Sequence, residues 1–324
     1  MKGRENNKMH NVLYIVVPCY NEEEVLELTT ERLTEKMESL ITDGIIDKNS
    51  RIMYVNDGSK DSTWSIIKKL NEQNQYVVGV NLSRNRGHQN ALLAGLMTAK
   101  EYADIVISMD ADLQDDINVI DKFIEKYNSG CDVVYGVRSS RKKDTFFKRN
   151  TALFFYKLMN KLGAEVVYNH ADYRLMSKRA LNELEKYKEV NLFLRGIIPL
   201  IGFKSDTVEY VRNERAAGES KYPLKKMINF AMEGILSFSI KPIRMITISG
   251  ITVFIASLIY MLYIIISSFV RNDFVPGWAT IITLICLFSG FQILCIGVIG
   301  EYIGKIYSET KSRPRYIIQD FISK

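Results

Sequence analysis

The sequence predicts an α/β domain followed by two transmembrane helices. Short apolar stretches alternate with helical patterns over residues 1–140, and two later stretches contain no charged residue. Strands that are apolar without alternation, and that are separated by helices, indicate a parallel sheet covered on both faces. Ligands of such sheets bind beyond the carboxyl ends of the strands.

The order of the elements follows from their hydrophobic periodicity. Strands are predicted at residues 12–17, 51–55, 77–81, 104–109 and 132–137. Helices are predicted between them at residues 22–40, 62–73, 87–99 and 118–128. Residues 145–162 mix aromatic and basic side chains, which is typical of a helix at a membrane interface, although a helix that caps the sheet would carry the same pattern. Residues 203–212 return to strand character.

The membrane prediction comes from the last third of the chain. Residues 245–270 and 276–300 are uncharged, and each stretch exceeds the roughly 20 apolar residues that cross a bilayer. Two buried helices of a soluble core are the alternative. We predict an amphipathic helix over 223–242, transmembrane helices at about 243–270 and 276–302, and a basic tail over 305–324.

The net charge supports this arrangement. Residues 221–324 carry eleven basic and five acidic side chains, a balance that equals the +6 of the whole 324-residue chain. The excess positive charge therefore lies beside the apolar stretches, which argues against a nucleic-acid-binding domain. By the positive-inside rule, both termini and the domain of residues 1–222 are expected on the cytoplasmic side of the plasma membrane. Four cysteines without a CxxC pair favour a reduced compartment.

Polar loops follow four of the predicted strands, at residues 18–23, 56–59, 83–87 and 110–114. Because the carboxyl ends of parallel strands meet at one edge of a sheet, we expect these loops to form a single site.

Asp110, Asp112 and Gln114 place three oxygen ligands on a short turn after an apolar strand. Such a set suits Mg²⁺ or Mn²⁺, which complete their coordination with water and phosphate oxygens. Surface loops often contain an isolated Asp-x-Asp, but the three other polar loops on the same edge favour the metal. The cation would bridge the two phosphates of a sugar nucleotide and stabilise the departing nucleotide. Asp115 and Asp116 are expected to begin the next helix.

The loop around Asp57 and Gly58 suits a nucleotide. The Asp57 carboxylate can accept hydrogen bonds from a base or ribose, while the glycine permits a tight turn. An Asx turn that caps the helix at Ser62 is the alternative. Tyr20 and Glu22, with the neighbouring proline at position 18, would form the opposite wall.

Cations and one further carboxylate extend the site. Arg138, Arg215 and Lys221 are candidates for holding phosphates, and solvated surface cations are the alternative. Asp172 could act as a base or orient the acceptor, whereas a structural pair with Arg174 would serve only the fold. His88 and His170 lack metal-ligand spacing and are expected to be loop or rim residues.

These motifs resemble the family 2 inverting glycosyltransferases, in particular the polyprenyl-phosphate enzymes such as dolichyl-phosphate mannose synthases and bactoprenol glucosyltransferases. The resemblance is carried by Pro18-Cys-Tyr-Asn-Glu-Glu, Val55-Asn-Asp-Gly-Ser, Arg84-Asn-x-Gly, Asp110-Ala-Asp-Leu-Gln and Arg215-x-x-Gly-x-Ser-Lys-Tyr. It spans almost the whole chain and implies a glycosyltransferase A-type, Rossmann-like fold for the α/β domain.

The resemblance also implies roles for individual residues. It implies nucleotide contacts from Pro18, Tyr20, Glu22, Val55, Asp57, Asp110, Ala111 and Asp112. It implies metal ligation by Asp110, Asp112 and Gln114. It implies phosphate or acceptor contacts from Arg138, Arg215, Ser220, Lys221 and Tyr222, and catalytic importance for Asp172, Arg215 and Lys221. A lipid phosphate is already anionic at neutral pH, so it hardly needs a base.

The expected reaction is transfer of one hexose, with inversion, from a nucleoside-diphosphate sugar to polyprenyl phosphate at the cytoplasmic membrane face. UDP-glucose and undecaprenyl phosphate are preferred, and the product would serve cell-envelope glycan modification. The same chemistry with GDP-mannose, UDP-galactose or UDP-N-acetylglucosamine is the first alternative. A processive polysaccharide synthase would carry a Gln-x-x-Arg-Trp motif, which is missing, and a non-catalytic membrane scaffold is the third possibility. Gly300 and Gly304 allow close helix packing, which favours a homo-oligomer. A flippase is a second expected type of partner.

Overall fold

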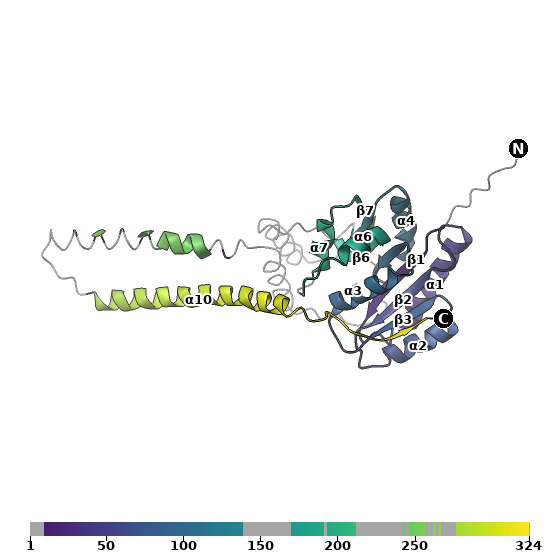
Figure 1. Cartoon of the computed structure of the whole chain (residues 1–324), viewed down its shortest axis with the longest axis horizontal. Coiled ribbons are helices and arrows are strands. Elements are labelled where there is room, and N and C mark those ends of the chain that lie inside the picture. Colours follow the sequence, from purple (N-terminus) through teal and green to yellow (C-terminus); the bar gives the residue numbers. More distant parts are fainter. Residues whose placement is uncertain are drawn as a thin grey trace. The chain divides into compact units, whose positions relative to one another are not determined.

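The computed structural model describes residues 10–138, 170–190, 193–211 and 277–323, together with scattered residues between 243 and 266. The chain divides into two compact units (Figure 1). The first unit comprises residues 1–157, 165–223 and 314–324, and the second comprises residues 158–164 and 224–313. The predicted helices at 145–162 and 223–242 lie outside the described residues.

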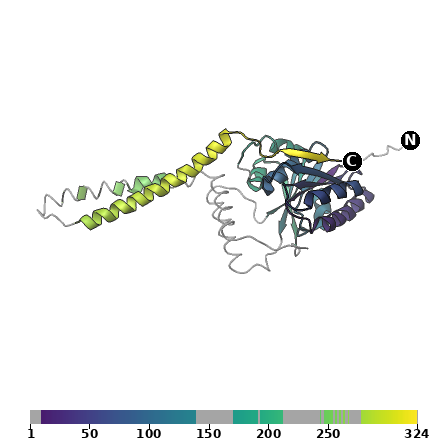
Figure 2. The same ribbon diagram turned by 90° about the horizontal axis from the view of Figure 1, so that it is seen from below.

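The first unit contains one eight-stranded sheet in the order β7-β5-β6-β4-β1-β2-β3-β8. The strands are β1 (Leu13–Cys19), β2 (Arg51–Asn56), β3 (Val77–Leu82), β4 (Ile105–Ser108), β5 (Val133–Arg138), β6 (His170–Ser177), β7 (Ser205–Tyr210) and β8 (Ile318–Ile322). Strands β1 to β4 are parallel, whereas β6 is antiparallel to β4 and β5, and β8 is antiparallel to β3. Figure 2 shows β8 in yellow beside the sheet. The predicted parallel sheet is therefore the centre of a mixed one.

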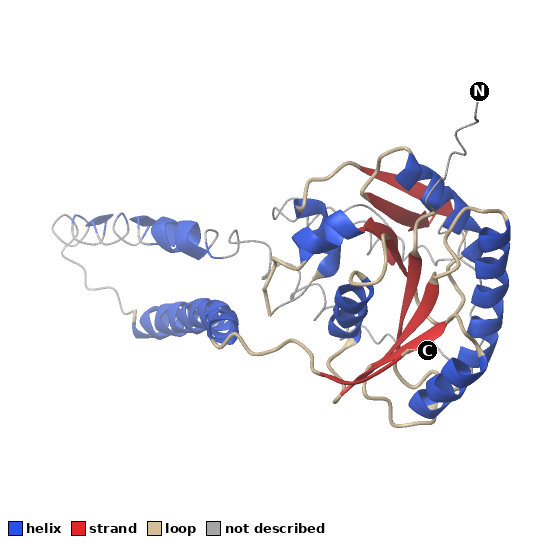
Figure 3. Ribbon diagram, turned by 45° about the vertical axis from the view of Figure 1, so that its right-hand side comes forward, coloured by secondary structure: helices blue, strands red, loops and turns tan. Residues whose placement is uncertain are grey.

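Helices cover both faces of this sheet (Figure 3). They are α1 (Leu26–Thr42), α2 (Thr63–Gln73), α3 (His88–Ala99), the short 3₁₀ helix η1 (Ile117–Val119), α4 (Ile120–Asn128), α6 (Lys178–Leu184) and α7 (Leu194–Leu200). In α1, Leu26, Leu33, Met37 and Leu40 are buried at helical spacing, so this helix presents an apolar stripe to the sheet. The prediction of an α/β domain covered on both faces is confirmed.

The predicted strands and helices of residues 12–138 all appear, with ends that differ by a few residues. The largest difference is at α1, which begins at Leu26 because residues 22–25 form a turn in which the carbonyl of Glu22 accepts from the amides of Val25 and Leu26. The predicted strand at 203–212 is β7. The sequence did not predict β6, α6, α7 or β8. Residues 318–322 were assigned to a basic tail, yet they return to the first unit as a strand.

The second unit contains α10 (Trp278–Thr310), whose exposed side chains include Ile281, Ile285, Ile293 and Ile296. Among the residues that the structure describes, no helix combines the length and the apolar character needed to cross a bilayer. The two predicted transmembrane helices are thus not supported by the described residues.

Candidate active site

The loops that follow β1 and β2 are joined into one piece by hydrogen bonds. The amide of Asn21 donates to Ser59 Oγ at 3.0 Å, and the amide of Lys60 donates to Asn21 Oδ1 at 2.9 Å. Asn21 has a φ of 56°, a left-handed conformation that asparagine tolerates better than most residues. The two loops therefore keep one shape together, as the prediction of a single site requires.

Asp57 connects these loops to the loop after β3. Its side chain is buried, and its carboxylate accepts from the amides of Arg86 at 2.7 Å and Gly87 at 2.9 Å. Burial raises the pKa of Asp57, and the two amide hydrogen bonds oppose that rise. The alternative of an Asx turn at Ser62 is wrong, because the Ser62 amide donates to Glu23 Oε2 instead. A contact between Asp57 and a nucleotide stays a prediction.

Gly58 is required by close packing as well as by its backbone angle. Its φ is +63°, and a Cβ at this position would lie 2.5 Å from the Asn85 nitrogen and 2.6 Å from the Arg84 carbonyl carbon. No side chain fits there, so the loops after β2 and β3 can lie against each other only with glycine.

The other predicted nucleotide residues differ in accessibility. Tyr20 is 40% exposed and Glu22 is half-buried, so both present surface at this edge of the sheet. Pro18 is buried at the end of β1. Val55 is 0% exposed, which leaves its side chain no surface for a nucleotide. The side chain of Val55 therefore faces the core, and the nucleotide contact of this residue stays a prediction.

The Asp-x-Asp loop is held in a strained conformation. Thr29 of α1 donates its hydroxyl to the carbonyl of Ala111 at 2.8 Å, and the amide of Gln114 donates to Asp112 Oδ1 at 3.2 Å. Between them Leu113 has a φ of 55°, which is unusual for a residue with a branched side chain. The loop thus keeps the three predicted metal ligands within one turn.

The donor set of this loop fits a hard divalent cation. Within the described part of the chain, no three His, Cys, Asp or Glu side chains are grouped so that they could hold a metal ion alone. Two carboxylates and an amide oxygen are nevertheless enough for Mg²⁺ when a diphosphate and water supply the rest. Desolvation raises the pKa of Asp110; His88 opposes this, but the carboxylates of Asp172 and Asp112 add to the rise. A bound cation would relieve that repulsion.

Asp172 lies in a clamp of two arginines. Arg195 donates Nε to Asp172 Oδ1 at 3.2 Å and Nη2 to Oδ2 at 2.9 Å, and Arg174 Nη2 also donates to Oδ1. Burial acts against ionisation, yet Arg195, His88 and Arg174 lower the pKa of Asp172 well below its usual range. The structural pair with Arg174 that the sequence offered as an alternative is confirmed. A carboxylate this acidic is a weak proton acceptor at neutral pH.

His88 links this clamp to the metal-ligand loop. It is the first residue of α3, and its Nε2 lies 3.4 Å from Asp172 Oδ2 and 3.8 Å from Asp110 Oδ1. Burial lowers the pKa of His88, but the two carboxylates outweigh it and raise the pKa. The predicted rim position of His88 is confirmed, while its contacts with two candidate site residues were missed.

Arg195 was missed altogether. It comes from α7, in a segment where the sequence predicted no element, and its side chain is 29% exposed. No local signal distinguishes this arginine from a surface cation, because its partner lies 23 residues away on another element.

Asp115 belongs to a second buried group behind the loop. Tyr210 donates its hydroxyl to Asp115 Oδ1 at 2.5 Å, and Arg138 Nε donates to the Tyr210 oxygen at 3.4 Å. Burial raises the pKa of Asp115 to about 6. The prediction that Asp115 begins the next helix is wrong. Asp116 caps it, accepting from the amide of Asn118 at 3.0 Å.

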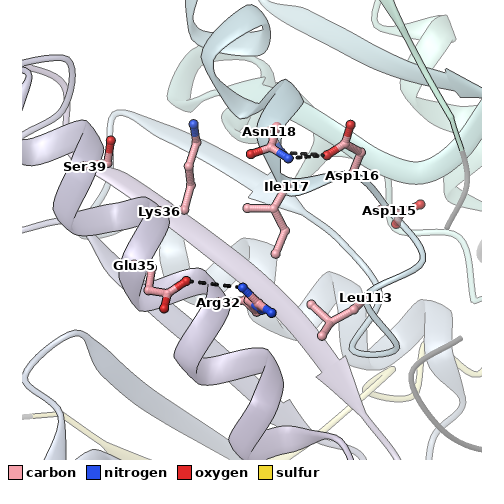
Figure 4. Close-up of a pocket in the computed structure, with 9 residues that line it drawn as sticks. All are labelled: Arg32, Glu35, Lys36, Ser39, Leu113, Asp115, Asp116, Ile117 and Asn118. Carbon is pink, nitrogen blue, oxygen red and sulfur yellow. Dashed lines mark hydrogen bonds and ion pairs between the residues drawn. The ribbon is translucent and has the colours of Figure 1, made fainter. Parts of the chain in front are cut away.

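A cavity of about 480 Å³ adjoins the Asp-x-Asp loop on its α1 side (Figure 4). Its lining comes from α1, through Arg32, Glu35 and Lys36, and from the loop, through Leu113 and Asp115 among others. Arg32 and Glu35 form an ion pair at 3.7 Å in which both side chains are more than half exposed. The cavity is thus open to solvent and lies against one of the four loops.

Four residues of the predicted acceptor set lie outside the described residues. They are Arg215, Ser220, Lys221 and Tyr222. Their contacts with phosphate or lipid stay predictions.

Comparison with known proteins now identifies the class. Residues 14–185 match the glycosyl transferase family 2, and residues 241–306 match the GtrB C-terminal hairpin. The chain is 56% identical over 307 residues to a glycosyltransferase of Bacillus subtilis, YkoT, covering 95% of this chain and 91% of that protein. It is 42% identical over 306 residues to the bactoprenol glucosyl transferase of Shigella phage SfX, covering 94% and 98%.

Among solved structures, the chain is similar to glucosyl-3-phosphoglycerate synthase of Mycobacterium tuberculosis in complex with Mn²⁺ and UDP-glucose. The TM-score is 0.44 and the identity 16%, over 70% of this chain and 78% of that one. The protein is a glycosyltransferase with a nucleotide-sugar transferase fold of the A type. It belongs to glycosyltransferase family 2, as the sequence motifs predicted.

Proposed function

We propose that this enzyme transfers glucose, with inversion, from UDP-glucose to a polyprenyl phosphate such as undecaprenyl phosphate, and so supplies glucose for cell-envelope glycans. The observation that carries the proposal is the meeting of the Asp-x-Asp loop with the clamped Asp172. His88 lies between Asp110 and Asp172, within 4 Å of both. The similarity to a bactoprenol glucosyl transferase over 94% of the chain supports the choice of sugar and acceptor.

Asp110, Asp112 and Gln114 would hold the divalent cation, either Mg²⁺ or Mn²⁺. When bound, the cation supplies positive charge against the diphosphate that leaves with the nucleotide. The loops after β1, β2 and β3 would hold the nucleotide, and Tyr20 offers an exposed ring at that position.

The acceptor phosphate needs orientation more than deprotonation, because it is already anionic at neutral pH. The low pKa of Asp172 also favours an orienting role over that of a base, since this carboxylate stays ionised between Arg174 and Arg195. We assign Asp172 to orienting Arg195 and His88 at the site where the phosphate arrives. Arg138, Arg215 and Lys221 would add further positive charge for that phosphate.

The site of action that we propose is the cytoplasmic face of the plasma membrane. The uncharged stretches 245–270 and 276–300, with basic residues before and after them, support two membrane spans. Both stretches lie within residues 241–306, which match a C-terminal hairpin, and this match supports the proposal. Labelling of single cysteines from each side of sealed vesicles tests this topology. Labelling of residue 273 from the cytoplasmic side would contradict it.

The reaction is tested with membranes that contain the full-length protein, undecaprenyl phosphate and radiolabelled sugar nucleotides. We expect an organic-extractable, acid-labile glucosyl lipid from UDP-glucose, no product in EDTA, and recovery with Mg²⁺ or Mn²⁺. A product from another nucleotide sugar alone would change the donor. A polymer would indicate a processive synthase, and absence of turnover would indicate a scaffold.

A further inference from the structure

The C-terminal strand is an integral part of the sheet although the chain reaches it only after the second unit. Strand β8 pairs with β3 through Gly79↔Ile322 and Asn81↔Asp320. A Cβ on Gly79 would lie 2.8 Å from Ile67 Cγ2 and 2.9 Å from Ile322 Cγ1, so the side chains of α2 and β8 fill the space beside this glycine.

A chain of side-chain hydrogen bonds runs from this strand into the sheet. Asn81 Nδ2 donates to Asp320 Oδ2 at 2.9 Å, and Asn56 Nδ2 donates to Asn81 Oδ1 at 2.8 Å. A carboxylate can only accept hydrogen bonds, so Asp320 determines which end of the Asn81 amide faces Asn56. Asn81 in turn determines the orientation of Asn56, whose Oδ1 accepts from the Ser59 amide at 3.3 Å.

This series of side-chain hydrogen bonds ends in the loops where the nucleotide is expected. Asn56 is the last residue of β2 and directly precedes Asp57, and Ser59 Oγ holds the loop after β1 through Asn21. The C-terminal segment also holds the loop after β3, because the Ser83 amide donates to the carbonyl of Ile317 at 3.0 Å. Asn56 and Asn81 are buried, so water competes little for these bonds.

We infer that Asp320 is a positioning residue for the nucleotide site, acting through Asn81 and Asn56. This inference rests on the proposed function, which places the nucleotide on the same loops. Asp320 fixes the amide of Asn81, Asn81 fixes Asn56, and Asn56 fixes the turn at Asp57 and Ser59. Loss of the first bond loosens the turn without removing any group that touches substrate.

The test uses the full-length enzyme with Asp320→Ala, Asp320→Asn and Gln319→Ala. Asp320→Ala is expected to raise the KM for UDP-glucose about three- to tenfold, the effect of one lost hydrogen bond. The kcat and the KM for undecaprenyl phosphate should stay within about twofold. Asp320→Asn should restore the donor KM, since its amide oxygen can accept from Asn81. Gln319, exposed in the same strand, is the matched control and should behave as the wild type.

Each outcome bears on the inference. The inference is overturned if the Asp320→Ala enzyme folds and its KM for UDP-glucose is unchanged. It is also overturned if this variant shows only a lower melting temperature and a lower kcat. If the alanine variant does not fold, Asp320→Glu keeps the charge but moves the carboxylate, and an unchanged donor KM there overturns it equally. Calorimetry of the wild type with UDP separates a failure of the proposed function from a failure of the role inferred for Asp320. A wild type without UDP binding or turnover ends the proposed function and this inference together, whereas an active wild type confines the failure to Asp320.

Discussion

The candidate active site has two halves, and they are held together by different interactions. On the donor side, the loops after β1, β2 and β3 are held by amide and carboxamide hydrogen bonds that centre on Asn21, Asn56 and Asp57. On the other side, Asp110, His88, Asp172 and two arginines form a cluster of charges in contact. One half therefore has a fixed shape with little net charge, and the other has a strong local field.

Under the proposed function, the donor side would recognise the nucleotide and the charged side would take part in the reaction. Hydrogen bonds to backbone amides fix the shape of a pocket without a field that would attract other ions. Charges that are held in place before the reaction stabilise charge that develops during it, at no further reorganisation. We therefore expect substitutions in the charged half to lower kcat and substitutions in the donor half to raise the donor KM.

The largest effect is expected from Asp112→Ala. Loss of this carboxylate removes a proposed metal ligand, and kcat/KM should fall at least about thousandfold. Glucosyl-lipid formation in membranes measures the effect, and immunoblotting of the membrane fraction shows whether the variant is still inserted. Asp116→Asn, which keeps the helix cap in the same loop, should retain nearly full activity. Near-normal turnover of Asp112→Ala would remove the metal argument.

Arg195→Ala should have the next largest effect. It removes both hydrogen bonds from α7 to Asp172, and we expect kcat to fall about a hundredfold with the donor KM changed less than about threefold. Steady-state kinetics with each substrate varied in turn separates these constants. Arg179→Ala is the matched control, because that arginine is exposed and packs over Phe203. A rise in donor KM as large as the loss in kcat would contradict the division between the two halves.

Asp57→Asn tests the donor half. The new amide group can accept only one of the two backbone hydrogen bonds, so we expect the donor KM to rise about tenfold and kcat to change little. Asp47→Asn is the control, since Asp47 accepts from the Asn49 amide in a turn before β2. A loss confined to kcat would show that Asp57 belongs with the reacting groups.

The smallest effect concerns Asp115 and appears in stability. Its folded-state pKa of about 6 lies above the ordinary value, so ionisation disfavours the folded state. The stability that protonated Asp115 contributes is complete at low pH and is lost as the pH rises to about 6. In EDTA at pH 8, Asp115→Asn should raise the free energy of unfolding by about 1 kcal/mol and the Tm by a few degrees. Both gains should be smaller at pH 5. Thermal unfolding at the two pH values checks this, with exposed Glu24→Gln as control. An equal gain at both pH values would contradict it.

Much of the rim could be predicted because its signals are local. An apolar run followed by a polar loop identifies a strand and its carboxyl end, which placed Asp57, Asp110 and Asp112 at one edge. The same reasoning failed at β6, because Asp172 and Arg174 interrupt its apolar pattern with two buried charges.

The central strands, the helices between them, the edge at which the polar loops gather and the family of the enzyme could all be predicted from the residues alone. Those features depend on residues close together in the chain, whose spacing sets local structure. The order of strands in the folded sheet could not be predicted in this way. Strand β6 lies next to β4, which brings Asp172 to His88, and β8 forms one edge of the sheet, which brings Asp320 to Asn81. Such pairs lie up to 239 residues apart. Their contacts arise from strand order, which no local pattern of apolar and polar residues encodes.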